Sequence, residues 1–233
     1  MEEQADAVFS LVSLLKRGVS FAAYSLPGYH DLNFIVDDNI SPVVSSRKFI
    51  ITTWSGNKLE IIDRGNDTHS VVECSDFRPM TGQKRTTTSW EDYKAGIEKV
   101  TGLLKSTAGK VVISRRKILT CPSLGYSLIA KCIMEMFATY GNAFRAVYYT
   151  PATGAWCVCS PELLINVDKK TGEMNTVALA GTRQAGTAGM WDDKNRQEHN
   201  YVVRYICNVM KSLGITPDAH ASETLTTGNI EHI

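Results

Sequence analysis

The sequence predicts an α+β fold in which antiparallel sheets are packed by helices. Two observations favour this class. Short apolar or alternating runs follow one another with only Pro, Gly, Asp or Asn turns between them, and strands joined in this way pair in antiparallel order. Longer segments repeat apolar residues every three or four positions, which is typical of helices that lay one face on a sheet.

The composition is typical of a soluble globular protein. The chain has 233 residues, of which 43% are hydrophobic and 21% charged, so it can form one large or two small domains. Its net charge of +1 gives no reason to expect nucleic acid or an acidic membrane as partner. No apolar run approaches the roughly 20 residues of a membrane span, and the acidic, amphipathic start is unlike a signal peptide. We therefore expect a cytoplasmic protein.

The first 80 residues predict an N-terminal α/β subregion. An amphipathic helix is expected over residues 5–17 and ends at Gly18. A polar stretch over residues 75–88 indicates a long connection, so we expect a boundary there between regions 1–80 and 81–233. The strands expected before this boundary are 19–25, 32–36, 48–54 and 58–63.

The second region predicts helices and strands in alternation. Ser89, with Asp92 three residues later, indicates the start of a helix with an apolar stripe from Trp90 to Leu104. The other helices are expected near 123–140 and over 192–213, each followed by a glycine. The strands are expected at 110–115, 144–150, 154–159, 163–168 and 174–180.

The six cysteines show no C-x-x-C pair, so the sequence does not indicate a zinc or redox site. Cys157 and Cys159 alternate along one expected strand and therefore share a face. We expect all six to be small buried residues in a reducing compartment.

Lys110 stands at the entry of an apolar strand. Alternation places it on the same face as Val112, where partial loss of solvent would make a neutral amine available as a general base. The alternative is a lysine at the strand end that reaches water, which taken alone is the commoner case.

Two glutamates are candidates for chemistry. Glu162 follows Ser160 and Pro161 at a turn between strands, where burial in a cleft would favour a protonated carboxyl and a general-acid role. A solvated turn residue is the alternative. Glu198 lies four residues before Val202, at the head of an apolar helical stripe, so it needs a base or a cation such as Mg²⁺. Its alternative is a place in the first helical turns that favours the helix dipole.

A strand running into a turn at residues 176–187 offers a further candidate. The small residues here let a ligand approach the backbone, and Gly181 and Thr182 provide an N–H and a hydroxyl. By itself a plain transition from strand to loop explains the same pattern.

Four motifs stand in one order: GKVVISR at 109–115, SPELL at 160–164, ALAGTRQAG at 178–186 and NRQEHNYVV at 195–203. In this order and spacing the chain resembles the chorismate-utilising enzymes, which include isochorismate synthases, salicylate synthases and the large subunits of anthranilate and aminodeoxychorismate synthases. The resemblance covers residues 75–233 and, more faintly, 20–36. It implies that family's fold, with 81–233 as the N-terminal portion of the catalytic domain.

The resemblance also implies roles for the matching residues. Lys110 matches the general base that activates water to attack C2 of chorismate, and Glu162 matches the general acid that protonates the hydroxyl leaving C4. Glu198 matches a glutamate that binds Mg²⁺, which in turn holds the ring carboxylate. The residues matched to substrate-binding positions are Gly181, Thr182 and, in the segment NIEH, His232.

Lys110 and Ala180 also separate the subfamilies. Anthranilate-type enzymes, which use ammonia, typically carry glutamine where this chain has Lys110, and aminodeoxychorismate synthases typically carry lysine where it has Ala180. The resemblance therefore implies water as nucleophile and an isochorismate synthase of menaquinone or siderophore biosynthesis. Salicylate synthase remains the alternative, and the sequence leaves the oligomeric state open.

The chain departs from the family in two places. The loop over residues 184–194 is shorter than usual, and the chain stops at Ile233, where the family continues to a second Mg²⁺-binding glutamate and an arginine for a substrate carboxylate. We therefore expect a truncated product with little or no isochorismate synthase activity from these 233 residues alone. The alternative of another class is a non-catalytic module that keeps the fold and binds a partner through unfinished sheet edges.

Overall fold

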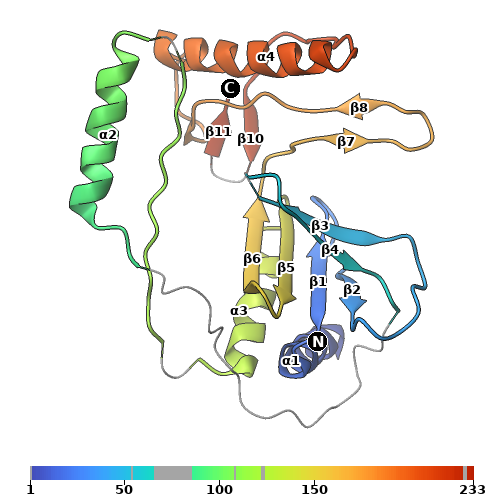
Figure 1. Cartoon of the computed structure of the whole chain (residues 1–233). Coiled ribbons are helices and arrows are strands. Elements are labelled where there is room, and N and C mark those ends of the chain that lie inside the picture. The colour runs from blue at the N-terminus through green and yellow to red at the C-terminus, as the bar shows by residue number, and fades with distance from the viewer. Residues whose placement is uncertain (1, 54, 66–85, 108, 122–123, 228–229) are drawn as a thin grey trace. The chain divides into compact units, whose positions relative to one another are not determined.

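The computed structural model describes residues 2–53, 55–65, 86–107, 109–121, 124–227 and 230–233. The chain forms two compact units, each made of two stretches of sequence (Figure 1). Unit 1 comprises Met1–Gln83 and Cys121–Pro161, and unit 2 comprises Lys84–Thr120 and Glu162–Ile233. The boundary expected at residue 80 lies outside the described residues.

Unit 1 is built on a four-stranded antiparallel sheet in the order β2-β1-β5-β6. The strands are β1 (Ser20–Ser25), β2 (Asn33–Asp37), β5 (Phe144–Thr150) and β6 (Gly154–Ser160). Ala22 of β1 lies opposite Ile35 on one side and Tyr148 on the other, so β1 and β5 are the two central strands. The sequence predicted each of these four strands to within one residue at either end.

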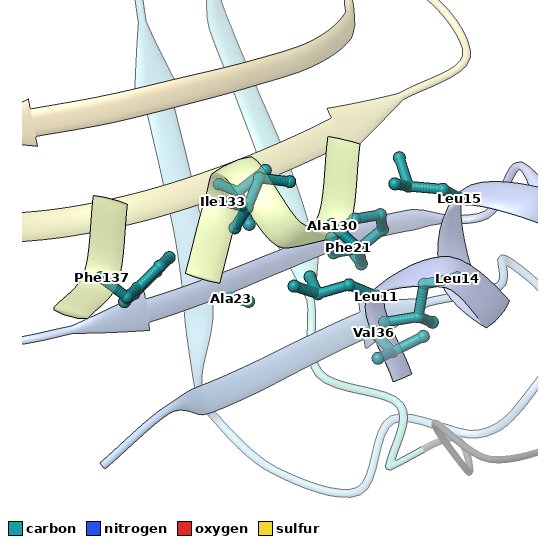
Figure 2. Close-up of a cluster of buried hydrophobic side chains, with 10 residues drawn as sticks. Leu11, Leu14, Leu15, Phe21, Ala23, Val36, Ala130, Ile133 and Phe137 are labelled. Atoms are coloured by element: carbon teal, nitrogen blue, oxygen red, sulfur yellow. The ribbon is translucent and has the colours of Figure 1, made fainter. Parts of the chain in front are cut away.

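Two helices pack on one face of this sheet. They are α1 (Glu2–Arg17), which ends at Gly18 as expected, and α3 (Tyr126–Thr139). Figure 2 shows their apolar side chains beside those of β1 and β2, and Val147 of β5 belongs to the same cluster. The buried residues of this cluster are Leu11, Leu14, Leu15, Phe21, Ala23, Val36, Ala130, Ile133, Phe137 and Val147.

The opposite face of the sheet is packed by a hairpin of β3 (Lys48–Thr52) and β4 (Lys58–Ile62). Ile61 is fully buried and joins Ala22, Ile35 and Tyr148 in a second apolar cluster, with Phe49 packed against it. Unit 1 is therefore an antiparallel sheet with helices on one face and a hairpin on the other, which agrees with the predicted α+β class.

Unit 2 contains two helices and two small sheets. The helices are α2 (Trp90–Leu104) and α4 (Asp193–Ser212). The sheets are the pair β7 (Asn166–Val167) and β8 (Met174–Asn175), and a three-stranded sheet in the order β10-β11-β9, from Leu225–Thr227, Ile230–His232 and Arg183–Gln184. None of the helices in the described part of the chain is long and apolar enough to cross a membrane.

Several expectations for unit 2 are wrong. Residues 110–115 form no strand, and the strands expected at 163–168 and 174–180 are reduced to two residues each. No residue of α2 is buried, although Ser89 caps the helix by accepting a hydrogen bond from the Asp92 N–H at 3.0 Å. A local apolar pattern becomes a buried strand or helix face only where a neighbouring element covers it.

The cysteines also differ from expectation. Cys121, Cys132, Cys157 and Cys159 are exposed, and Cys207 is half-buried. Cys74 lies outside the described residues. Cys157 and Cys159 lie on β6, which is an edge strand of its sheet, and an edge strand has a neighbour on one side only.

Candidate active site

A single open pocket of about 350 Å³ in unit 2 brings together all six residues that the sequence singles out. They come from the segment around Lys110, the start of the stretch after β6, the turn before β9, helix α4 and strand β11. The lining residues are Lys110, Val112, Glu162, Leu179, Ala180, Gly181, Thr182, Lys194, Asn195, Glu198 and His232. The geometry around each residue differs from expectation in ways that bear on its chemistry.

Lys110 lies on an extended segment that is neither helix nor strand. Its ammonium nitrogen is 3.0 Å from Oε1 of Glu198, and 31% of its side chain is exposed. The expected loss of solvent beside Val112 is not found, because Val112 is 81% exposed. Lys110 is thus held at the pocket by an ion pair and not by an apolar strand.

Backbone contacts anchor the extended segment just after Lys110. Arg116 O accepts from the Thr88 N–H at 3.0 Å, and Arg115 Nε donates to Thr88 O at 3.0 Å. The Arg115 guanidinium also lies over the Trp90 ring, 5.6 Å from its centroid. These contacts tie the segment to the start of α2 and limit how far Lys110 can move.

Glu198 lies in the second turn of α4, which begins after the N-cap residue Asp192. The Asp192 carboxylate accepts from the Asn195 N–H at 2.7 Å, so the start of the helix is fixed. Lys194 reaches Oε2 of Glu198 at 3.4 Å. Hydrogen bonding from Lys110 holds the pKa of Glu198 below its ordinary value, against the opposing effect of burial. Glu198 is therefore an ionised carboxylate.

The apolar stripe expected behind Glu198, which comprises Val202, Ile206, Val209 and Leu213, is only partly covered. Val202 and Ile206 are half-buried, whereas Val209 and Leu213 are exposed. His199 is the buried residue of α4. His199 Nε2 lies 3.0 Å from Ala178 O, and its Nδ1 lies 3.2 Å from Ser222 Oγ. The buried His199 thus fixes the helix against the extended segment that leads to Gly181, and Glu198 beside it faces the pocket at 25% exposure.

Glu162 lies two residues beyond the end of β6 and lines the pocket. It is exposed, so the burial on which its general-acid role was predicted is not found. The position of Glu162 at the pocket wall agrees with the prediction, but the side chain is more exposed to solvent than the sequence suggested.

The turn at Gly181 needs glycine for two reasons. Its φ of +65° lies in the left-handed region, and a Cβ there would lie 2.9 Å from Asn195 Oδ1 and 3.2 Å from Trp191. The neighbouring residue Ala180 exchanges two backbone hydrogen bonds with Ile233, at 2.9 and 3.1 Å. The backbone therefore passes close to α4 at the wall of the pocket.

His232 on β11 faces Thr182 and Gly181. Its Nδ1 lies 3.0 Å from the carbonyl oxygen of Gly181 and 3.2 Å from Thr182 Oγ1. Because a carbonyl can only accept, Nδ1 carries a hydrogen, and in the neutral ring Nε2 is then the acceptor. The side chain is 7% exposed, and Nε2 is buried without a hydrogen-bond partner in the described structure. A buried acceptor of this kind is suited to a hydroxyl donor from a ligand.

An ion pair fixes the strand pair that carries Thr182 and His232. Arg183 Nε donates to Oε2 of Glu231 at 2.8 Å, and the Gly186 N–H donates to Oε1 at 2.9 Å. The Gly186 hydrogen bond, followed by that of Arg183, holds the pKa of Glu231 below its ordinary value. Glu231 thus stabilises the turn at residues 183–186 through its charge. It does not line the pocket.

Sequence reasoning missed Lys194 and Asn195, which also line the pocket. A signal for both was present, since residues three and four positions before Glu198 share its face of a helix. The pairing of Glu198 with Lys110 had no such signal, because it joins segments that are distant in sequence.

The pocket offers few ligands for a metal ion. Among the described residues, no group of three or more His, Cys, Asp or Glu side chains is arranged to hold one. Mg²⁺ is often bound by one or two carboxylates, with substrate oxygens and water completing its shell. Glu198 supplies one such carboxylate, but Lys110 and Lys194 engage its two oxygens, so the described lining alone does not form a site for the ion.

The comparison with protein families supports the resemblance noted in the sequence. A family model described as chorismate binding enzyme matches residues 45–233, which include all six predicted pocket residues. The match also takes in β3 and β4, ahead of the stretch from residue 75 on which the sequence resemblance is based. No curated protein and no solved structure matches the chain.

Proposed function

The chain belongs to the chorismate binding enzyme family, and from this premise we propose that it is an isochorismate synthase. The reaction adds water at C2 of chorismate and expels the hydroxyl at C4, so that the ring double bonds shift and the overall change is an isomerisation. The observation that carries the proposal is one pocket lined by both a lysine and a glutamate suited to these two proton transfers.

Lys110 is the proposed general base. When its amine is neutral, it accepts a proton from the attacking water as the new C2–O bond forms. Glu162 is the proposed general acid, and it protonates the C4 oxygen as that bond breaks, so that water leaves. Lys110 thus acts at C2 and Glu162 at C4, and the reaction needs no reactant other than water.

The remaining pocket residues are proposed to bind the substrate. The Thr182 hydroxyl and the close backbone at Gly181 contact the ring, and the free lone pair of His232 Nε2 accepts a hydrogen bond from a substrate hydroxyl. Glu198 is the proposed ligand of Mg²⁺, which when bound supplies positive charge that holds a substrate carboxylate.

Lys110 and Ala180 favour water over ammonia as the nucleophile. In anthranilate-type enzymes, which use ammonia, the position of Lys110 typically holds glutamine. In aminodeoxychorismate synthases the position of Ala180 typically holds lysine. The pathway we propose is menaquinone or siderophore biosynthesis, in which isochorismate is the product required.

The test is conversion of chorismate by a stoichiometric amount of the purified chain with Mg²⁺, followed by chromatographic separation of isochorismate and salicylate. Stoichiometric protein allows even slow conversion to be detected. We expect slow formation of isochorismate, in line with the little activity expected of these 233 residues alone, and no detectable product from Lys110→Ala or Glu162→Gln. Circular dichroism checks that both variants keep the fold.

Two exposed residues away from the pocket provide matched controls. Lys170→Ala and Glu135→Gln make the same chemical changes and should leave the rate unchanged. Salicylate as the main product would instead identify a salicylate synthase. Binding of chorismate without any conversion would contradict the proposal and favour a non-catalytic binding module.

A further inference from the structure

A second pocket of unit 2, of about 470 Å³, lies beside helix α4 and shares no lining residue with the candidate active site. Arg196 lines this pocket and is half-buried. Within the described residues, no ion pair joins its guanidinium to a carboxylate. A half-buried cation without a counter-charge is suited to an anionic ligand, and the planar guanidinium matches a carboxylate with two parallel hydrogen bonds.

Other polar groups of the same pocket fit an anion that carries one charge. Thr224 Oγ1 accepts from the Trp191 Nε1–H at 2.9 Å, so the Thr224 hydroxyl keeps its own hydrogen to donate. The Asn200 amide, one turn beyond Arg196, also lines the pocket. Glu223 lines it too and would repel a second negative charge. The pocket therefore favours a carboxylate over a phosphate group, which carries nearly two charges at neutral pH.

The pocket continues into a groove of about 510 Å³ that is largely apolar on the side of α4. The two cavities share the lining residues His199, Ser222, Glu223 and Ile233. The groove is lined on α4 by the half-buried Val203, Ile206 and Met210, which lie roughly two, three and four turns beyond Arg196. This spacing places them on the same face of the helix as Arg196. The opposite wall is the segment over residues 173–179, which runs from β8 toward Gly181 (Figure 1).

We propose that this continuous groove binds a monoanionic carboxylic acid with an extended apolar chain. The carboxylate pairs with Arg196, and the chain lies along α4 toward Met210. The distance between these residues along the helix is about 21 Å, which suits an extended chain more than a compact ring. The reverse orientation is disfavoured, because Glu173 and Asp218 line the groove but not the Arg196 pocket and would repel the carboxylate.

The first test uses decanoate as the probe, below its micelle concentration, in isothermal titration calorimetry with the full chain. We expect one molecule to bind and Arg196→Met to raise the Kd by about tenfold, since the carboxylate loses its charged donor. Arg204→Met removes an exposed arginine of α4 outside both linings and should leave the Kd unchanged. Decanol, which has the same chain without the charge, should bind more weakly than decanoate and equally to the native chain and Arg196→Met.

A second pair of variants tests the apolar part of the groove. Val203→Asp places a negative charge beside the proposed chain and should abolish decanoate binding, whereas Val209→Asp, at an exposed position of α4 outside the groove, should not. Octanoate, with two fewer methylene groups, should bind several-fold more weakly than decanoate. Circular dichroism checks that each variant keeps the fold. A native chain that does not bind decanoate, or folded Arg196→Met that binds it as tightly as the native chain, overturns the proposal.

Cys207 provides a test of where the probe binds. It is half-buried in the lining of the groove, whereas Cys121 is exposed in unit 1. We expect saturating decanoate to slow the alkylation of Cys207 by N-ethylmaleimide several-fold and to leave Cys121 unchanged, as measured by mass spectrometry of peptides. Equal rates at Cys207 with and without bound decanoate would place the probe elsewhere and overturn the proposal. None of these readouts depends on conversion of chorismate, so they stand or fall separately from the proposed function.

Discussion

Arg145 is the largest fully buried side chain of the described structure, and its charge is balanced without a carboxylate. Its guanidinium donates to four backbone carbonyls, those of Ala143, Phe137, Leu26 and Tyr29. These carbonyls belong to the end of α3, the turn after it and the loop after β1. One side chain therefore binds backbone groups from three segments of unit 1, and the bonds to Ala143 and Phe137 are buried while those to Leu26 and Tyr29 are partly buried.

We predict that Arg145→Met lowers the free energy of unfolding of unit 1 by about 2–4 kcal/mol, because the buried carbonyls of Ala143 and Phe137 lose their donor. Urea denaturation followed by circular dichroism measures the change. Arg204→Met removes an arginine that is exposed on α4 and should alter stability by less than about 0.5 kcal/mol. Equal effects of the two substitutions would show that burial of Arg145 has no energetic role.

The pocket shows how far single residues can be predicted from sequence. Motif order led to six residues that line one pocket, because each motif has a recognisable local pattern. The partner of Lys110 could not be predicted in the same way, since an ion pair between segments distant in sequence leaves no local pattern. The tautomer of His232 likewise depends on the Gly181 carbonyl, which approaches it only in the folded chain.

At the level of elements, prediction succeeded where the signal is local. In unit 1 the strands alternate and end at turns, and the helices end at glycine, so their bounds follow from short windows of sequence. In unit 2 the apolar runs at 110–115 and 163–168 resemble strands equally well but have too few neighbouring strands for a hydrogen-bonded ladder. Strand formation depends on a neighbouring strand, and a short window of sequence does not show whether the fold will provide one.

An ion pair and hydrogen bonds of Asp63 lie at the end of the β3–β4 hairpin, and they should make the stability of the hairpin depend on pH. Asp63, just after β4, is 4% exposed and accepts from Ser45 Oγ at 2.8 Å and Arg47 Nε at 2.9 Å. Burial alone would raise the pKa of Asp63, but these hydrogen bonds and that from Gly65 outweigh it and hold the pKa below its ordinary value of 3.8.

We predict that Asp63→Asn lowers the free energy of unfolding by about 1–2 kcal/mol at neutral pH. Because the folded pKa is depressed, the stabilisation by Asp63 is fully present above the ordinary value and is lost as the pH falls through the folded value. The difference between native chain and variant should therefore shrink below about pH 4. Denaturation curves over a series of acidic buffers measure it, and a difference independent of pH would contradict the assignment.

At the level of the whole molecule, burial is unevenly shared. Both apolar clusters lie in unit 1, whereas the buried residues described in unit 2 are Ala180, His199, His232 and Ile233. The sequence indicated the α+β class correctly. It carried no signal that each compact unit combines two separate stretches, because composition changes along the chain do not reveal where the chain returns in space.

We predict that hydrogen exchange separates the two units. Amides of β1 and β5, which are hydrogen-bonded on both sides beneath two apolar clusters, should exchange most slowly. Amides of α2, which has no buried residue, should exchange fastest among the helices. Mass spectrometry of peptic fragments over a time course gives both rates, and uniform protection across the two units would contradict this picture.

The central pair of unit 1 also sets the order in which this chain can fold. Phe21 of β1 pairs with Tyr149 of β5, and all of β1 to β4 is synthesised well before β5. During translation the early strands therefore emerge with one edge of β1 unpaired and without the cover of α3. Closing so long a loop is slow compared with local steps, and a chain with an unpaired strand edge is prone to association. We therefore expect association of this chain to be greatest before β5 has been synthesised.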